Sequence, residues 1–163
     1  DRRGRRVTLT ARPTTYKGTL MRSRLEAGYA AWLDHVGFDW SYEAHCYAGP
    51  GGQWLPDFTI HQVYDVLTRT LCTAHVEVKP EFTQDVADEY HRRTAGVPQG
   101  DLVLIQTPRR QADTVSVRGS TGWVSGRWSL IAAPSGFPCM VLTVKPKPSN
   151  CPWPDEWWKG PAT

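Results

Sequence analysis

Hydrophobic residues recur at helical spacing in the first part of the chain. Four of them would form one stripe of a helix: Leu25, Tyr29, Trp32 and Val36. This spacing predicts a helix over residues 19–36. Thr19 could cap its start, and Gly37 could end it in a left-handed conformation.

Alternating hydrophobic and polar residues follow this helix. The alternation over residues 38–47 predicts a strand, and the Gly- and Pro-rich stretch 48–52 predicts a turn before a second strand over 53–60. The two strands would form a hairpin. Residues 61–72 fit either a short helix or a strand, and residues 75–79 form a short β-like run.

The second half combines one helical repeat with hydrophobic runs. We expect a helix over residues 83–95 and a buried central strand over 101–107. Residues 108–126 look like a polar loop, and strands are predicted over 127–133 and 139–144. The mixed order predicts an α/β fold, with a central mixed β-sheet flanked by helices.

The length of 163 residues fits one domain with a single core. We expect a mobile basic arm over residues 1–18, the folded domain over 19–145, and a tail rich in Pro and Trp over 146–163. No hydrophobic run is long enough to predict a membrane span. The four cysteines have no metal-binding spacing, so we expect reduced thiols and a cytoplasmic protein.

The net charge of +3 is too small to indicate nucleic acid by itself, but the arginines are clustered. The cluster at the start of the chain consists of Arg2, Arg3, Arg5 and Arg6. Such a cluster could bind the phosphates of DNA, or it could be an ordinary solvated surface. We take these four arginines as candidate DNA-binding residues.

Two candidate catalytic residues lie on the predicted strand 75–79. Side chains two positions apart on a strand share a face, so Glu77 and Lys79 should project together while Val76 and Val78 face a core. The carboxylate could hold a divalent cation, and the ammonium could stabilise or orient an attacking oxygen. An isolated pair of this kind would more often be a surface ion pair.

Two further carboxylates complete the candidate site. Asp57, at the end of the predicted second hairpin strand, could supply a second oxygen ligand, and Mg²⁺ needs few protein carboxylates. Glu26 lies at the edge of the hydrophobic stripe of the first helix, where it could be a third ligand or orient a water. The alternatives are a turn role for Asp57 and a helical ion pair between Glu26 and Arg22.

The same residues resemble a known family. The segments that carry the resemblance are Pro56-Asp57 with Glu77-Val78-Lys79, Arg22-Ser23-Arg24-Leu25-Glu26, Leu55-Pro56-Asp57-Phe58 and Tyr42-Glu43. Together they are similar to the PD-(D/E)XK, or restriction-endonuclease-like, nucleases, in particular to small members, many of them from phages. The resemblance covers roughly residues 20–106. One departure is the distance of 20 positions between Asp57 and Glu77, which indicates an insertion or a lengthened hairpin.

The resemblance implies a restriction-endonuclease-like core and hydrolysis of DNA phosphodiester bonds with Mg²⁺ or Mn²⁺. It implies that Asp57 and Glu77 bind the metal, that Lys79 positions or activates water, and that Glu26 completes the site. The candidate DNA-binding residues of this part of the chain are Arg22, Arg24 and His75. The expected partner is DNA, and a homodimer is expected by analogy only.

Other roles remain open for several residues. Glu43 could be an accessory ligand or lie on a solvent-exposed strand face, and His75 could be an ordinary strand residue. Gln84 and Tyr90 follow the predicted strand, but Tyr90 continues a hydrophobic stripe, which favours core packing.

The leading hypothesis is an endonuclease, either structure-specific, like a resolvase, or nicking. An exonuclease, an RNA substrate and a catalytically silent DNA-binding or assembly module are the alternatives.

Overall fold

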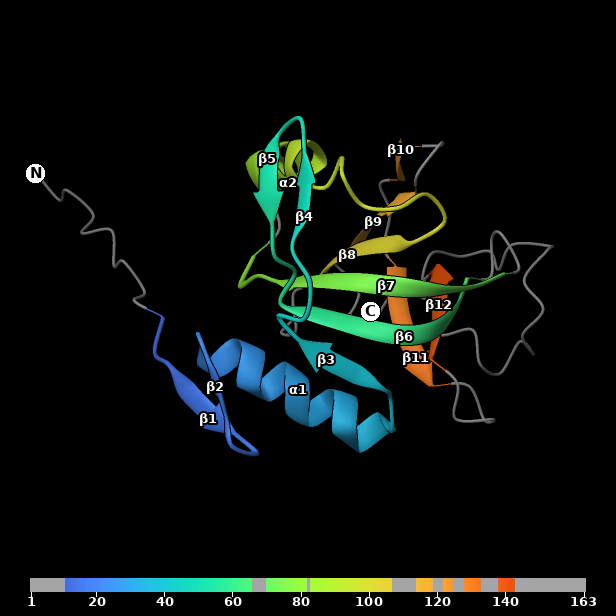
Figure 1. The fold of residues 1–163 in the computed structure, drawn as a ribbon. Helices are drawn as coiled ribbons and strands as arrows, with labels where there is room; N and C mark the ends of the chain where they lie inside the picture. Colours follow the sequence, from blue (N-terminus) through green and yellow to red (C-terminus); the bar gives the residue numbers. More distant parts are fainter. Residues whose placement is uncertain are drawn as a thin grey trace, which may run out of the picture.

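The structure of the chain is a computed structural model with a mixed α/β fold (Figure 1). It describes residues 11–65, 70–81 and 83–106. It also describes four strands further along, β9 (Thr114–Arg118), β10 (Gly122–Val124), β11 (Trp128–Ala132) and β12 (Pro138–Leu142). The predicted arginine cluster at positions 2–6 and the predicted tail lie outside the described residues.

A large mixed sheet forms the centre of the fold. Its order is β10, β9, β8 (Leu102–Gln106), β7 (Thr70–Val78), β6 (Phe58–Asp65), β12 and β11, and β3 (Trp40–Tyr42) also pairs with β6. Strands β6 and β7 are antiparallel neighbours, whereas β7 and β8 are parallel. Helix α2 (Gln84–Arg93) provides the long connection that two parallel neighbours require.

Helix α1 (Arg24–Val36) precedes the sheet in the chain, and residues of suitable type define both of its ends. Ser23 is the N-cap, and its hydroxyl accepts a hydrogen bond from the Glu26 amide at 3.1 Å. The helix ends at Gly37, which has a φ of 79°, as its sequence position predicts.

The predicted helix start at Thr19 is wrong. Thr19–Met21 is strand β2, which pairs with strand β1 (Thr14–Tyr16) in a two-stranded hairpin beside α1 (Figure 1). β1 falls within the segment predicted to be a mobile arm. The side chains of Ser23 and Glu26 provide the capping interaction that was assigned to Thr19.

The two helices cover opposite faces of the sheet. Alternate residues of β8 show this, because Leu102 and Leu104 belong to the core beneath α1, whereas Val103 and Ile105 pack with Tyr90 of α2. These four residues are all buried, which confirms the predicted buried central strand. Glu77 lies on β7 and bonds to α2, so the charged face of β7 is the α2 face.

A second small hairpin packs against α2. It consists of β4 (Tyr47–Gly49) and β5 (Gly52–Trp54), and it interrupts the longer hairpin predicted over 38–60. Glycines allow the two backbones to touch, since a Cβ on Gly51 would lie 2.1 Å from the Arg92 carbonyl oxygen. The contact fixes the position of Trp54, the last residue of the hairpin.

The remaining predictions have mixed outcomes. Helix α2 and strands β11 and β12 lie within or close to the predicted ranges. The ambiguous stretch 61–72 belongs to β6 and β7, so these strands form a lengthened hairpin. The predicted loop 108–126 is wrong in part, because it contains β9 and β10.

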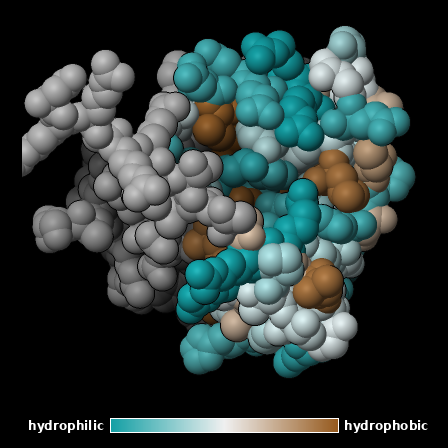
Figure 2. Space-filling view, turned by 90° about the vertical axis from the view of Figure 1, so that its left-hand side faces the viewer, coloured by the Kyte–Doolittle hydropathy of each residue, from teal (hydrophilic) through white to brown (hydrophobic). Residues whose placement is uncertain are grey.

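On the face shown in Figure 2, the described residues form no single large hydrophobic patch. Hydrophobic spots there are separated by hydrophilic residues, outside the parts drawn in grey (Figure 2). Over the described residues, no helix has the length and hydrophobicity needed to cross a membrane.

Two glycine substitutions should have opposite effects on stability. Gly28 is an exposed position of α1 where a Cβ would meet nothing within 4 Å, so Gly28→Ala should raise the free energy of unfolding by about 0.5–1 kcal/mol. A Cβ on Gly96 would lie 2.1 Å from the Ala48 carbonyl oxygen, so Gly96→Ala should lower the free energy of unfolding by about 1–3 kcal/mol. Urea unfolding of both variants measures the two changes. Equal stability of Gly96→Ala and the wild type would show that the hairpin does not pack closely on α2.

Candidate active site

The start of α1 positions the first carboxylate of the site, Glu26. Its side chain is 7% exposed, and Oε1 accepts a hydrogen bond of 3.0 Å from the Ser23 hydroxyl. Oε2 accepts bonds from the Tyr42 hydroxyl at 2.7 Å and from the Arg22 amide at 3.1 Å. Burial and the bond to Glu26 raise the pKa of Tyr42 to about 12, so this hydroxyl stays a donor. The helix N-terminus also favours a negative charge here.

Asp57 lies directly before β6 and is 2% exposed. Its Oδ2 accepts a hydrogen bond of 2.7 Å from the backbone amide of Val78, at the end of β7. Its Oδ1 contacts the guanidinium of Arg22. The sequence placed Asp57 at the end of a strand, and the structure instead places it at the start of β6, beside the end of the neighbouring strand β7.

Glu77 lies on β7 and is surrounded by three donors. The Trp54 indole N–H donates to Oε2 at 3.0 Å, and the Tyr90 hydroxyl donates to Oε1 at 2.8 Å. The Nζ of Lys79 lies 3.0 Å from the same Oε1 and 5.2 Å from the centre of the Tyr90 ring. This pair confirms that Glu77 and Lys79 share one strand face.

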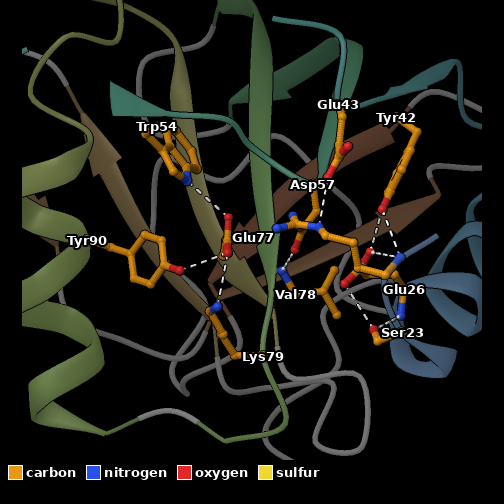
Figure 3. Close-up of polar contacts among 11 residues, drawn as sticks. Ser23, Glu26, Tyr42, Glu43, Trp54, Asp57, Glu77, Val78, Lys79 and Tyr90 are labelled. Carbon is orange, nitrogen blue, oxygen red and sulfur yellow. Dashed lines mark hydrogen bonds and ion pairs between the residues drawn. The ribbon is translucent and has the colours of Figure 1, made fainter. Parts of the chain in front are cut away.

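Figure 3 shows how these groups converge. Glu77 lies with Trp54, Tyr90 and Lys79, and Asp57 and Glu26 lie toward α1 (Figure 3). The groups come from the start of α1, the start of β6, the end of β7, the hairpin β4–β5 and α2. The site therefore lies where the two antiparallel strands β6 and β7 meet both helices.

The charges of the three carboxylates act on one another. Burial raises the pKa of Asp57 to about 7, and the charges of Glu77 and Glu26 add to this increase. The Val78 amide and the Arg22 guanidinium lower the same pKa but do not compensate. Burial and the neighbouring carboxylates therefore outweigh the amide and the guanidinium that favour the charged form of Asp57.

Lys79 remains a cation in this environment. Burial lowers its pKa, but the charge of Glu77 and the contact with Tyr90 outweigh burial, so the pKa lies above its ordinary value. Burial raises the pKa of Tyr90 to about 12, and the charge of Glu77 contributes to this increase. Lys79 can therefore donate hydrogen bonds and stabilise negative charge, but it cannot accept a proton.

The carboxylates have the right chemistry for a magnesium ion. Asp57 and Glu77 offer hard oxygen donors, and Mg²⁺ is usually held by one or two carboxylates together with waters. The raised pKa of Asp57 shows the charge crowding that a cation would relieve. Within the described ranges, no three His, Cys, Asp or Glu side chains are arranged to enclose a metal ion by themselves.

The structure places His75 away from the solvent. This residue is 1% exposed, its Nε2 lies 2.8 Å from Asp101 Oδ2, and its ring packs against Tyr47. Because the β4–β5 hairpin covers that part of the sheet face, this burial does not favour the DNA-binding role predicted for His75. Burial lowers the pKa of His75, although the contact with Asp101 opposes this effect.

Arg22 has a different role from the predicted helical pair with Glu26. It lies before α1, and its guanidinium pairs with Asp57 and with Glu43, whose Oε1 is 2.8 Å from Nε. Glu43 therefore faces the site rather than only the solvent. Arg24 is exposed at the start of α1, so it remains a candidate DNA-binding residue.

Sequence reasoning missed two residues whose side chains hold the carboxylate of Glu77. Trp54 was not considered, and Tyr90 was assigned to the core only, although its hydroxyl bonds to Glu77. The helical spacing shows that Tyr90 faces the sheet, but it does not show which strand residue its hydroxyl reaches.

The raised pKa of Asp57 predicts how stability depends on pH in EDTA-containing buffer. The folded protein keeps this proton up to about pH 7, and the unfolded chain releases it near 3.8. The resulting stabilisation is complete below pH 3.8 and is lost as the pH rises through about 7. As the pH rises from 5 to 8, the free energy of unfolding of the neutral variant Asp57→Asn should therefore increase by about 1–3 kcal/mol relative to that of the wild type.

Urea unfolding across this pH range measures the difference between the two proteins. Glu89→Gln, which removes an exposed carboxylate of α2, is the control and should follow the wild type. A difference between Asp57→Asn and wild type that does not change with pH would show that Asp57 is not crowded by the other carboxylates.

Comparisons with known proteins add no assignment to this geometry. No protein-family model matches the chain, and neither a curated protein nor a solved structure matches it significantly. The function must therefore be inferred from the residues of the site and their surroundings.

Proposed function

We propose that the chain is a Mg²⁺- or Mn²⁺-dependent endonuclease that hydrolyses phosphodiester bonds in DNA. The observation that carries the proposal is the environment of Asp57, which is buried and whose pKa both Glu77 and Glu26 raise. A cluster of buried like charges is costly by itself, and a divalent cation is the partner that would stabilise it. Lys79, 3.0 Å from Glu77, adds the cation that phosphoryl chemistry uses.

Asp57 and Glu77 are the residues that would hold the cation. Glu26 would be a further oxygen donor, or it would orient a water. When bound, the divalent ion supplies Lewis-acid chemistry, which polarises the phosphate and makes a water nucleophilic near neutral pH. These roles agree with those that the PD-(D/E)XK resemblance implies.

The side chains around the cation have separate tasks. Lys79 orients the attacking water and stabilises the negative charge that develops on the phosphate, because its raised pKa keeps it protonated. Trp54 and Tyr90 are positioning residues, since their neutral N–H and O–H groups hold both oxygens of Glu77. The neutral Trp54 indole orients Oε2 without adding a positive charge that would repel the metal, whereas Oε1 also lies 3.0 Å from the Lys79 ammonium.

The arrangement of the elements also supports a restriction-endonuclease-like core. The resemblance implies a mixed sheet flanked by helices, and α1 and α2 lie on opposite faces of a sheet with antiparallel and parallel neighbours. Glu26 comes from the first helix, Asp57 from the start of β6, and Glu77 with Lys79 from the end of β7. This order along the chain is the order of the motifs in the resemblance.

A catalytically silent DNA-binding module is the second candidate. The observation that favours it is that Arg22 and Lys79 already contact Asp57 and Glu77. Cleavage of supercoiled plasmid and of branched DNA in Mg²⁺, Mn²⁺ or EDTA separates the two functions. The endonuclease requires cutting that EDTA abolishes, and closed circular plasmid also distinguishes it from an exonuclease, which needs a free end.

Lys79→Ala should reduce the rate of DNA cleavage about 100-fold or more, while metal and DNA binding remain. Lys17→Ala is the matched control, because Lys17 is an exposed lysine in the turn between β1 and β2 that pairs with Asp34 of α1, outside the site. Single-turnover cleavage of a labelled duplex measures the rates, and calorimetry measures metal binding. Normal turnover of Lys79→Ala would refute the role assigned to this lysine.

Deletion of residues 1–12 should weaken DNA binding and reduce its dependence on salt. Each arginine–phosphate contact that is lost should lower the slope of log K against log salt concentration by about one. Fluorescence anisotropy between 50 and 200 mM salt, roughly the range in which phosphate contacts dominate, provides the slope. An unchanged slope would mean that the first arginines do not contact DNA.

A further inference from the structure

Arg22 connects the carboxylates on the α1 side of the site. Its backbone amide donates to Glu26 at 3.1 Å, which fixes the origin of the side chain. Its guanidinium lies 2.8 Å from Glu43 through Nε and contacts Asp57 through a terminal nitrogen. One cation of this chain therefore pairs with the very carboxylate that would hold a divalent ion.

The position of Glu43 is held by its backbone. Its φ of 45° is unusual for a residue other than glycine, and its amide donates to the Asp57 carbonyl oxygen at 3.0 Å. Such a conformation persists only where the surroundings enforce it, and it is typical of functional sites. Here the conformation keeps the Glu43 carboxylate within reach of Arg22.

A metal ion and Arg22 would compete for Asp57. One carboxylate oxygen accepts the Val78 amide, so the other, Oδ1, is the better oxygen for a cation, and this is the oxygen that Arg22 contacts. Two cations at one oxygen would repel each other, and the burial of Asp57 strengthens this repulsion. Binding of a divalent ion therefore requires that the guanidinium move away from Asp57.

Arg22 is also able to move without opening the core. Its side chain is 58% exposed, whereas Asp57 is 2% exposed. The planar guanidinium can form paired hydrogen bonds with a phosphate as well as with a carboxylate. Glu43 would keep the displaced side chain close to the site.

We propose that Arg22 is an exchangeable counter-ion, which gives up Asp57 to the divalent cation and pairs with a DNA phosphate instead. This inference rests on the proposed nuclease function. The exchange makes the binding of metal and the binding of DNA mutually favourable, because each ligand removes one cost of binding the other. In the absence of DNA, Arg22 would keep the affinity of the site for metal low.

The test measures Mn²⁺ affinity without DNA by calorimetry at pH 8.5, with Arg22→Gln and Arg92→Gln as matched variants. Both remove one positive charge, but Arg22 contacts Asp57, whereas Arg92 is an exposed arginine of α2. Arg22→Gln should bind Mn²⁺ about fivefold or more tightly than Arg92→Gln and the wild type. The Mn²⁺ affinity of Arg22→Lys should lie between those of the wild type and Arg22→Gln, because an ammonium lacks the planar fork with which a guanidinium bridges Asp57 and Glu43. It also serves as the second variant if Arg22→Gln does not fold.

The second measurement repeats the titration with a short duplex in the Lys79→Ala background, in which the proposed function predicts no cutting. The duplex should raise the Mn²⁺ affinity about fivefold or more when Arg22 is present, including in Arg92→Gln, and clearly less in Arg22→Gln. Equal Mn²⁺ affinity of Arg22→Gln and Arg92→Gln, or an equal effect of DNA on both, would overturn the exchange.

Asp57→Asn separates this failure from a failure of the proposed function. If the wild type binds Mn²⁺ and Asp57→Asn does not, but the two arginine variants behave alike, only the exchange is wrong. If the wild type does not bind Mn²⁺ at any tested concentration, both the exchange and the metal-dependent nuclease are wrong.

Discussion

The burial of several carboxylates in one place is the constraint on which the rest of this structure depends. A carboxylate removed from water needs hydrogen bonds, a cation or a proton. Glu26 and Glu77 have their oxygens occupied by hydroxyl, indole, amide and ammonium donors. Asp57 has an amide and a guanidinium as partners, but burial and the charges of Glu77 and Glu26 still raise its pKa to about 7.

The fold supplies these donors from elements that are distant in sequence. The N-cap of α1 orients Glu26, and the end of β7 gives Asp57 its amide partner. The β4–β5 hairpin can bring Trp54 to Glu77 because glycines let its backbone touch α2. Packing and electrostatics are therefore coupled, since a displaced hairpin would remove a donor from a buried charge. Figure 3 shows the resulting convergence (Figure 3).

Local patterns in the sequence predicted the structural features that depend on residues close together in the chain. Strand alternation placed Glu77 and Lys79 on one face, and hydrophobic runs predicted β8. Features set by distant contacts were not predictable in this way. Strands β9 and β10 are short, lie in a mostly polar stretch of the sequence and pair with each other in the sheet, so that stretch resembled a loop. The alternation assigned a face to His75 but could not reveal that a hairpin covers it.

The central claim is that Asp57 and Glu77 share a divalent cation. A crystal structure of the protein with Mn²⁺ and a short duplex, with anomalous scattering recorded to locate manganese, tests it most directly. We expect a manganese peak in contact with both carboxylates, with the Lys79 ammonium directed at the adjacent phosphate. Manganese that binds elsewhere, while Asp57 stays paired with Arg22 and Glu77 with Lys79, would contradict it.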